Sequence, residues 1–321
     1  MAPAPSGVEA WYRTLSSRAT SRDLHRAVAI LALPLLTACH RPDDRAEIAR
    51  RMEHDTVPVL VGAGDIADCV HGADLTATLL DTIRGTVFVA GDAGYTSKRI
   101  LNPLITCFDQ TWGRHAARIR PSPGNHDYAD GGPARYFDYF GDRAGPRSLG
   151  YYSFELGTWH VISLNSVESI EADSPQDRWL HSDLAAHLGR CTVAFMHHPR
   201  FSSGPHEERE RMIPLWTTLA RHGVSVVIAG HDHIYERFQP LDADGRPDDE
   251  GTRQFVVGTG GASRYAIQRL LPGSEAQSDD SYGVLKLSLL PNTYRWEFVP
   301  VVRAGYQDRG ESTCHPTHVP R

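Results

Sequence analysis

The sequence has no run of basic residues, no internal repeat and no low-complexity tract. The formal net charge is −6 at pH 7, so we expect no nucleic-acid groove lined with lysine and arginine. A C-x-x-C pair is also absent, which argues against a zinc ribbon and against a thioredoxin-type redox site. An anionic substrate would therefore have to be held locally, by metal ions or by histidines.

The apolar stretch near the N-terminus is too short to cross a bilayer as a helix. It runs from Ala27 to Leu36, about 10 residues, whereas a membrane-spanning helix needs about 20. Arginines precede it at positions 18, 22 and 26, and Leu36-Thr37-Ala38-Cys39 follows. A basic segment, a short apolar core and small residues predict an export signal over 1–39.

The Leu-Thr-Ala-Cys sequence resembles the bacterial lipobox, in which the cysteine is lipidated and becomes the new N-terminus. We therefore expect an extracytoplasmic lipoprotein, anchored in the membrane through Cys39 and a charged tether over 40–55. The alternative is an ordinary cleaved signal with an incidental cysteine, which would leave a secreted or periplasmic protein.

Four cysteines remain besides Cys39, and in an exported chain they permit two disulfides with three possible connectivities. They are Cys69, Cys107, Cys191 and Cys314. Cys69 and Cys107 each follow a strand that carries a motif, which favours that pair. Cys314 lies in a polar C-terminal segment, 304–321, that a bridge would hold in place.

The order of patterns predicts an α/β fold. Apolar runs at 57–61 and 86–90 read as buried strands separated by helical spacing at 74–83, which is typical of a sheet with parallel members. The later segments have helical spacing at 98–118, 176–188 and 208–221, a hairpin pattern around Gly157-Thr158, and a last third that reads as strand. We expect a four-layer αββα sandwich of two mixed β-sheets flanked by helices, in one domain over 56–303.

Five short polar segments follow apolar runs at the predicted strand ends, where ligands collect in open α/β sheets. They are Gly64-Asp65-Ile66-Ala67, Gly91-Asp92-Ala93-Gly94-Tyr95, Gly124-Asn125-His126-Asp127, Met196-His197-His198-Pro199 and Gly230-His231-Asp232-His233. Each alone is most simply a turn or a packing residue. Five in one chain indicate a common site with enough oxygen and nitrogen donors for two metal ions.

The spacing of residues along each strand limits which side chains can bind the same metal ion. Adjacent side chains on a strand point in opposite directions, so at most one of His197 and His198 should face a given metal. His231 and His233 are two residues apart and can point the same way. Asn125 offers a neutral carbonyl ligand, and the imidazole of His126 can move protons near neutral pH.

The order and spacing of these motifs resemble the metallophosphoesterases, and most closely the purple acid phosphatase-like branch, over nearly the whole chain after the tether. The family pattern is D-x-G, G-D-x-x-Y, G-N-H-D/E, V-x-x-H and G-H-x-H. Ala67 and Ala194 replace the family glycine and valine without loss of a ligand.

The resemblance implies two metal ions that share the Asp92 carboxylate. One would be held by Asp65, Asp92, Tyr95 and His233, and the other by Asp92, Asn125, His197 and His231. The phenol of Tyr95, in a chain with Ala67 where other branches carry a histidine, implies Fe(III) paired with Zn, Mn or Fe(II).

The implied activity is that of a dimetal phosphohydrolase that cleaves phosphomonoesters on small substrates, by in-line attack of a metal-bound hydroxide. His126 is the expected group to contact phosphate or protonate the leaving group, and His206 has the family's spacing for a substrate-facing histidine. His198 and Arg200 are further candidates for substrate contact. A phosphodiesterase or nucleotidase with the same metals is the close alternative, and a surface scaffold with a dead site is a more distant one.

Overall fold

The computed structural model describes residues 57–129, 132–206 and 208–320. The predicted export signal over 1–39, its Cys39 and the tether over 40–55 lie outside these residues. The chain divides into the units Met1–Arg50 and Arg51–Arg321, and everything described below belongs to the second. Among the described residues, no helix has the length and apolar character needed to cross a membrane.

The first sheet has six strands in the order β13-β12-β11-β1-β2-β3. Strands β1, β2 and β3 run parallel, and β11 pairs antiparallel with both β1 and β12. The strand bounds are β1 Val59–Ala63, β2 Thr86–Ala90, β3 Ile119–Ser122, β11 Gly283–Leu289, β12 Thr293–Pro300 and β13 Asp308–Thr313.

The second sheet has seven strands in the order β10-β8-β9-β7-β6-β5-β4. Its centre, formed by β5, β6, β7 and β9, is parallel, and antiparallel strands flank it on both sides. The strand bounds are β4 Tyr152–Leu156, β5 Trp159–Ser163, β6 Thr192–Phe195, β7 Val226–Ala229, β8 Tyr235–Leu241, β9 Thr252–Val257 and β10 Ser274–Ser278.

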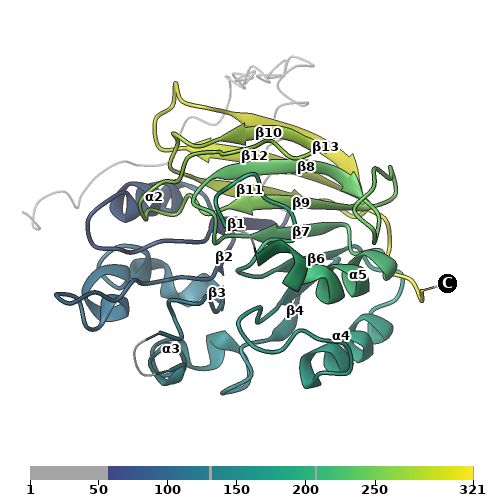
Figure 1. Cartoon of the computed structure of the whole chain (residues 1–321), viewed down its shortest axis with the longest axis horizontal. Helices are drawn as coiled ribbons and strands as arrows, with labels where there is room; N and C mark the ends of the chain where they lie inside the picture. Colours follow the sequence, from purple (N-terminus) through teal and green to yellow (C-terminus); the bar gives the residue numbers. More distant parts are fainter. Residues whose placement is uncertain (1–56, 130–131, 207, 321) are drawn as a thin grey trace, which may run out of the picture. The chain divides into compact units, whose positions relative to one another are not determined.

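Helices pack against the two sheets. Among the described residues, the α-helices are α2 Ala73–Thr82, α3 Ala134–Phe140, α4 Pro175–Ala186 and α5 Ile213–Arg221. The side chain of Ser174 accepts a hydrogen bond from the amide of Asp177, and Pro175 occupies the first turn, so α4 begins with two favourable N-terminal features. In Figure 1, α4 and α5 lie together beside β6.

The period of two along the strands places the core on both faces of the seven-stranded sheet. In β6, Val193 and Phe195 belong to the core shared with the first sheet, and Phe195 meets Phe88 of β2 with ring centroids 5.9 Å apart. Ala194 between them belongs to a second core that includes Leu180 of α4 and residues of α5. The predicted α/β fold of two mixed sheets with helices is confirmed.

Some local predictions differ from the structure. The helical pattern over 98–118 yields a π-helical turn at Leu104–Phe108 and a 3-10 helix at Trp112–Arg118 in place of one long helix. Strands β10 and β13 were not predicted, because both are polar segments at the sheet edges, where one face and one ladder side meet water. Strand β13 extends the first sheet into the segment 304–321 that was expected to be a tail.

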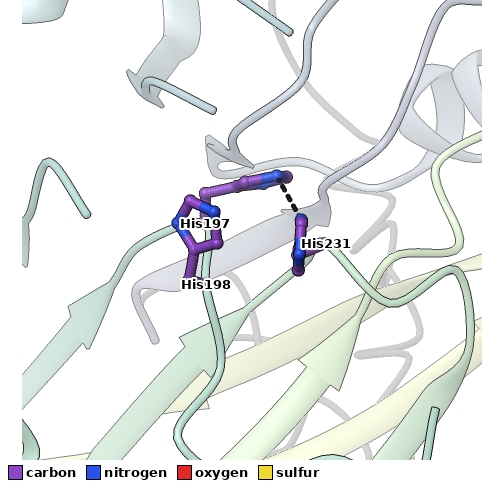
Figure 2. A group of neighbouring side chains, drawn as sticks. All are labelled: His197, His198 and His231. Carbon is purple, nitrogen blue, oxygen red and sulfur yellow. Dashed lines mark hydrogen bonds between the residues drawn. The ribbon is translucent and has the colours of Figure 1, made fainter. Parts of the chain in front are cut away.

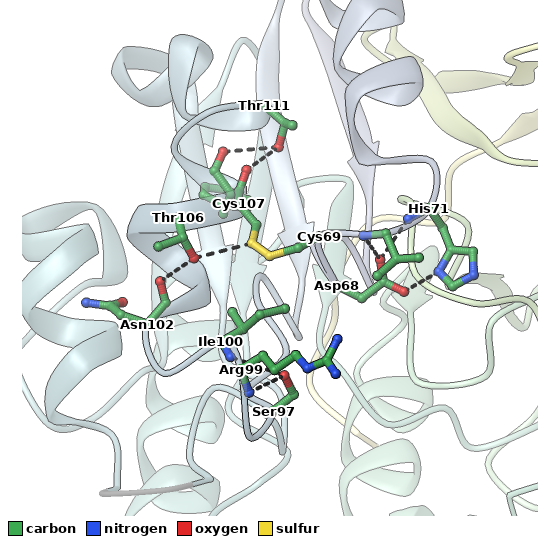
Figure 3. The surroundings of a disulfide bond; sticks show 12 residues. Asp68, Cys69, His71, Ser97, Arg99, Ile100, Asn102, Thr106, Cys107 and Thr111 are labelled. Atoms are coloured by element: carbon green, nitrogen blue, oxygen red, sulfur yellow. Dashed lines mark hydrogen bonds and ion pairs between the residues drawn. A yellow bond between two sulfur atoms is a disulfide. The ribbon is translucent and has the colours of Figure 1, made fainter.

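Two disulfides tie loops to this frame. Cys69 and Cys107 are bonded, as the sequence favoured, and Figure 3 shows the bridge between the loop after β1 and the helical turn at Leu104–Phe108. Cys191, next to the start of β6, is bonded to Cys314 just after β13. The second bridge therefore links the C-terminal segment to the second sheet.

Candidate metal centre

The polar segments singled out in the sequence converge at the carboxyl ends of the parallel strands. Asp65 follows β1, Asp92 follows β2, Asn125 follows β3, His197 follows β6 and His231 follows β7. Because the parallel strands of each sheet end on the same side, residues as distant in sequence as Asp65 and His231, 166 positions apart, become neighbours. The fold itself thus assembles the site.

The backbone at three of these positions adopts the left-handed conformation, with φ of 61° at Asp65, 51° at Asp92 and 70° at His231. Non-glycine residues rarely adopt it, and such strain concentrates at functional sites. The turns also leave no room for a side chain at the neighbouring glycines: a Cβ at Gly124 would lie 2.1 Å from Asp92 Oδ1, and one at Gly230 would lie 2.5 Å from Asp65 Oδ2. Sharp turns therefore aim the two carboxylates inward.

One group of donor atoms gathers around Asp65. The Tyr95 hydroxyl donates to Asp65 Oδ1 at 2.8 Å and lies 3.0 Å from His233 Nε2. The distance between His233 Nε2 and Asp65 Oδ1 is 3.3 Å. Three donor atoms at such mutual separations match the edges of a coordination shell with bonds of about 2.0–2.2 Å.

A second group gathers around His197. Its Nε2 lies 2.9 Å from Asn125 Oδ1, 3.3 Å from Asp92 Oδ2 and 3.2 Å from His231 Nδ1. Figure 2 shows His197 and His231 in contact, with the adjacent His198 at their side.

The two groups adjoin one another. Ligand atoms of Asp65, Asp92 and His197 all lie within 4.8 Å of one another. Asp92 thus stands between the group around Asp65 and the group around His197, and all seven residues predicted as ligands are brought together.

The far nitrogens of two imidazoles are fixed by backbone carbonyls. His197 Nδ1 is 3.0 Å from the carbonyl oxygen of Ala90, and His233 Nδ1 contacts that of Ser263. Histidine ligands of metals are oriented in this way, with one ring nitrogen donating to an acceptor and the other facing the ion. The ring of Tyr265 also stacks on His233 at 4.0 Å, which further fixes that ring.

Burial and mutual charges shift the pKa values of the groups in the centre. Burial alone would lower the pKa of His197, but the carboxylates of Asp92 and Asp65 raise it to about 10. Burial alone would raise the pKa of Asp65, but the charge and hydrogen bond of His233 hold it below its ordinary value. Burial and the charge of His197 lower the pKa of His231 to about 2, so that this imidazole remains neutral.

The residues present fit a pair of metal ions. Asp65 and Asp92 are 0% and 1% exposed, and the partners of their carboxylates are imidazoles, a phenol and backbone amides. Buried carboxylates need a positive charge beside them, which the imidazole of His197 supplies here and which bound metal ions would supply in its place. In addition, His231 Nε2 is buried and has no hydrogen-bond partner among the described residues. An ion or a ligand bound in the centre would provide a partner for this nitrogen.

Three of the four predicted substrate contacts lie around the same centre. The His126 ring is 4.5 Å from that of Tyr95, and its amide donates to Asp92 Oδ1 at 2.8 Å. The rings of His206 and His198 lie 4.1 and 4.5 Å from that of His231. The fourth candidate, Arg200, has its guanidinium over the ring of its neighbour Phe201.

Two buried acidic residues support the loops and were not predicted to do so. Asp127 accepts hydrogen bonds from the amides of Gly124 and Ala93 and so ties the third motif to the second. Burial and the charge of Asp92 raise the pKa of Asp127 to about 8. Asp232 lies 2.7 Å from His206 Nδ1 and orients that ring. In the sequence, Asp127 directly follows His126, and Asp232 lies between His231 and His233. This proximity to candidate site residues could have identified both.

A family model described as calcineurin-like phosphoesterase matches residues 23–235. This chain belongs to the calcineurin-like phosphoesterase family. Curated relatives and a solved structure support the purple acid phosphatase-like branch of that family.

Purple acid phosphatase 21 of Arabidopsis thaliana is 30% identical over 220 residues, which cover 62% of this chain and 49% of that protein. The chain spans about half the length of the curated relatives it matches. The solved structure of the purple acid phosphatase PPD1 from yellow lupin superposes with a TM-score of 0.64 at 18% identity, covering 80% of this chain and 54% of the other. The solved structure of GAP50, described as the anchor in the inner membrane complex of Plasmodium, superposes with a TM-score of 0.61 at 14% identity. The match covers 81% of this chain and 90% of that chain.

Proposed function

We propose that this protein is a metal-dependent phosphatase that cleaves phosphomonoesters on small substrates, with two metal ions and an in-line displacement at phosphorus. The observation that carries the proposal is the meeting of two donor groups at the buried carboxylate of Asp92. Membership of the calcineurin-like phosphoesterase family supports it.

In this proposal one ion is held by Asp65, Tyr95 and His233, the other by Asn125, His197 and His231, and Asp92 is shared by both. Such a pair, when bound, lowers the pKa of a coordinated water and neutralises the charge of the phosphoryl oxygens. The buried loops of the chain keep the donors in position before substrate arrives, so little reorganisation is needed.

Imidazoles provide the remaining contacts to substrate. His206 is held through Nδ1 by Asp232, and its side chain is 36% exposed, which leaves Nε2 available to phosphate oxygens. We propose that His126, whose backbone is tied to Asp92, binds phosphate or donates a proton to the leaving oxygen. His198 and Arg200 are proposed as further contacts.

The phenol of Tyr95 suits a hard, highly charged ion, so we propose Fe(III) in the group around Asp65, paired with Zn, Mn or Fe(II). A visible absorption spectrum with metal analysis tests this identity. A tyrosinate-to-iron band is expected, and its loss in Tyr95→Phe assigns it. Zinc or manganese alone, without that band, would contradict the iron assignment.

Hydrolysis of an aryl phosphate monoester against the matching diester tests the substrate class. We expect faster cleavage of the monoester, whereas faster cleavage of the diester would replace the proposal with a phosphodiesterase or nucleotidase. A scaffold role, such as the name of the structural neighbour GAP50 describes, would be indicated if the metal-loaded protein cleaved neither ester.

We further propose that the protein works outside the cytoplasm. Its two disulfides suit an oxidising compartment. Anchoring through an acylated Cys39 is part of this proposal, and mass spectrometry of the mature N-terminus in the native host tests it. An unmodified N-terminus downstream of Cys39 would indicate a secreted or periplasmic protein instead.

A further inference from the structure

A buried acidic residue outside the metal centre holds the loop that carries His206. Glu236 is the second residue of β8 and is 0% exposed. Its Oε2 accepts a hydrogen bond from the amide of Ser203 at 2.8 Å, and its Oε1 accepts one from the hydroxyl of Ser203 at 2.6 Å. Both oxygens of the carboxylate therefore bind a single residue of the loop, three positions before His206.

The contact between Glu236 and Ser203 fixes the position of the loop backbone. Hydrogen bonds to a charged acceptor are about twice as strong as neutral ones, and two parallel bonds also fix geometry. Burial raises the pKa of Glu236, and the hydrogen bonds from Ser203 oppose this shift. Ser203 is itself only 2% exposed. Any displacement of the loop would therefore leave a buried carboxylate without donors, which is costly.

Ser203 also joins this loop to a second one. Its hydroxyl accepts a hydrogen bond from the amide of Leu271 at 3.0 Å, and its carbonyl oxygen accepts one from the amide of Gln268 at 3.0 Å. The second loop follows β9 and includes Tyr265, whose ring lies 5.3 Å from that of His206. Ser203 thus fixes the loop of His206 against its neighbour as well as against β8.

Asp232 provides a separate anchor for the same loop. Its carboxylate accepts a hydrogen bond from the hydroxyl of Ser202 and contacts Nδ1 of His206 at 2.7 Å. A Cβ at Gly204 would lie 2.4 Å from the carboxyl carbon of Asp232, so the loop backbone passes directly over this side chain. Asp232 thus orients the ring of His206, while Glu236 holds the backbone three residues earlier.

We propose that Glu236 and Ser203 are positioning residues, which set the place where His206 meets a phosphate oxygen. The inference rests on the proposed function, because it takes His206 as a contact to phosphate. Such a hydrogen bond needs a separation of about 2.7–3.2 Å. A displacement of about 1 Å caused by a mutation away from the reacting atoms can cost about 100-fold in rate.

The test measures two properties of the full, metal-loaded chain: its affinity for inorganic phosphate by calorimetry, and kcat/KM for an aryl phosphate monoester. In Ser203→Ala we expect the Kd for phosphate to rise and kcat/KM to fall, each by about 10–100-fold. Glu236→Gln keeps one acceptor oxygen, so we expect a smaller loss in the same direction. Bound metal per chain should equal wild type in both variants.

The matched control is Ser225→Ala. Ser225 is 3% exposed and donates from its hydroxyl to the carbonyl oxygen of His315 at 3.0 Å. It directly precedes β7, at the opposite end of that strand from His231. Phosphate affinity and kcat/KM in this control should equal those of wild type.

A double variant separates positioning from general support of the fold. If Ser203 acts through His206, Ser203→Ala combined with His206→Ala should fall little below His206→Ala alone. Additive losses, or a loss of bound metal in Ser203→Ala, would overturn the proposal. Glu236→Gln serves if Ser203→Ala does not fold, since it preserves the size of the side chain.

The two readouts also separate this inference from the proposed function. A wild type that cleaves no ester, but binds phosphate more tightly than Ser203→Ala does, would refute the function and leave the inference standing. An active wild type that Ser203→Ala and Glu236→Gln match in both readouts would refute the inference and leave the function standing. A metal-loaded wild type that binds no phosphate would overturn the inference as well.

Discussion

The carboxylate of Asp65 accepts a 2.7 Å hydrogen bond from the backbone amide of His231, 166 residues further along the chain. This bond ties the turn after β1 in the first sheet to the turn after β7 in the second. Both residues have left-handed backbone, and each also presents a donor atom to the proposed metal centre. The hydrogen bond that links the two sheets therefore lies within the proposed active site.

Replacement of the shared carboxylate should abolish the paired centre. Asp92→Asn is expected to lower kcat by more than the about 10–100-fold that follows loss of an outer partner of a metal ligand. It should also reduce bound metal relative to wild type under the same loading. The exposed Asp248→Asn serves as control. Turnover equal to wild type in Asp92→Asn would refute a reaction at this centre.

A methyl group at Gly124 should displace Asp92. In Gly124→Ala the new Cβ would meet Asp92 Oδ1 at 2.1 Å and its backbone nitrogen at 2.4 Å, which forces the turn to move. We expect weaker metal binding and a fall in activity. Gly132→Ala is the control: it has φ of +76° but nothing within 4 Å, so it carries backbone strain of about 1–2 kcal/mol without a clash. Equal losses of bound metal and activity in the two variants would show that the clash with Asp92 has no effect of its own.

His206 and Asp232 should act as one unit. His206→Ala removes a hydrogen bond to a charged phosphate, for about 1.5–3 kcal/mol or about 10–100-fold in kcat/KM. Asp232→Asn should lower kcat/KM in the same direction, and the double variant should fall little below His206→Ala. His71→Gln, which breaks a similar pair with Asp68 on the surface, should have no effect on turnover. Additive losses in the double variant would show that the two residues act separately.

Asp183 should stabilise the fold in a pH-dependent manner. Burial alone would raise its pKa, but hydrogen bonds from His160 and Ser153 hold it below the ordinary value. This contribution is present above the unfolded pKa of about 3.9 and is lost as pH falls through the folded value. Urea unfolding without divalent ions should show Asp183→Asn less stable than wild type by about 1–3 kcal/mol at pH 7. A difference that persists undiminished at pH 2–3 would contradict this.

The bridge between Cys191 and Cys314 should hold the C-terminal strand. Replacing both cysteines by serine is expected to cost about 2–5 kcal/mol of unfolding free energy in urea. Hydrogen exchange should rise first in β13, the polar edge strand that the bridge follows. Unchanged stability and unchanged exchange in β13 would show that this strand does not depend on the bridge.

The sequence predicted the strands whose residues form short, buried apolar runs. Strands such as β2 and β7 are short apolar runs covered on both faces, and the donors follow directly from where these strands end. The seven donor residues could therefore be named before any geometry was known.

Features that depend on tertiary packing were beyond the sequence. Strands β10 and β13 lack an apolar pattern because they lie at polar edges. The contact of Asp232 with His206 requires a loop whose path is set by the second sheet.

Anomalous diffraction from crystals of the metal-loaded protein tests the central claim most directly. We expect two peaks about 3.5–4 Å apart, on either side of the Asp92 carboxylate, with Tyr95 at one and Asn125 at the other. A single peak, or peaks that do not share Asp92, would contradict it.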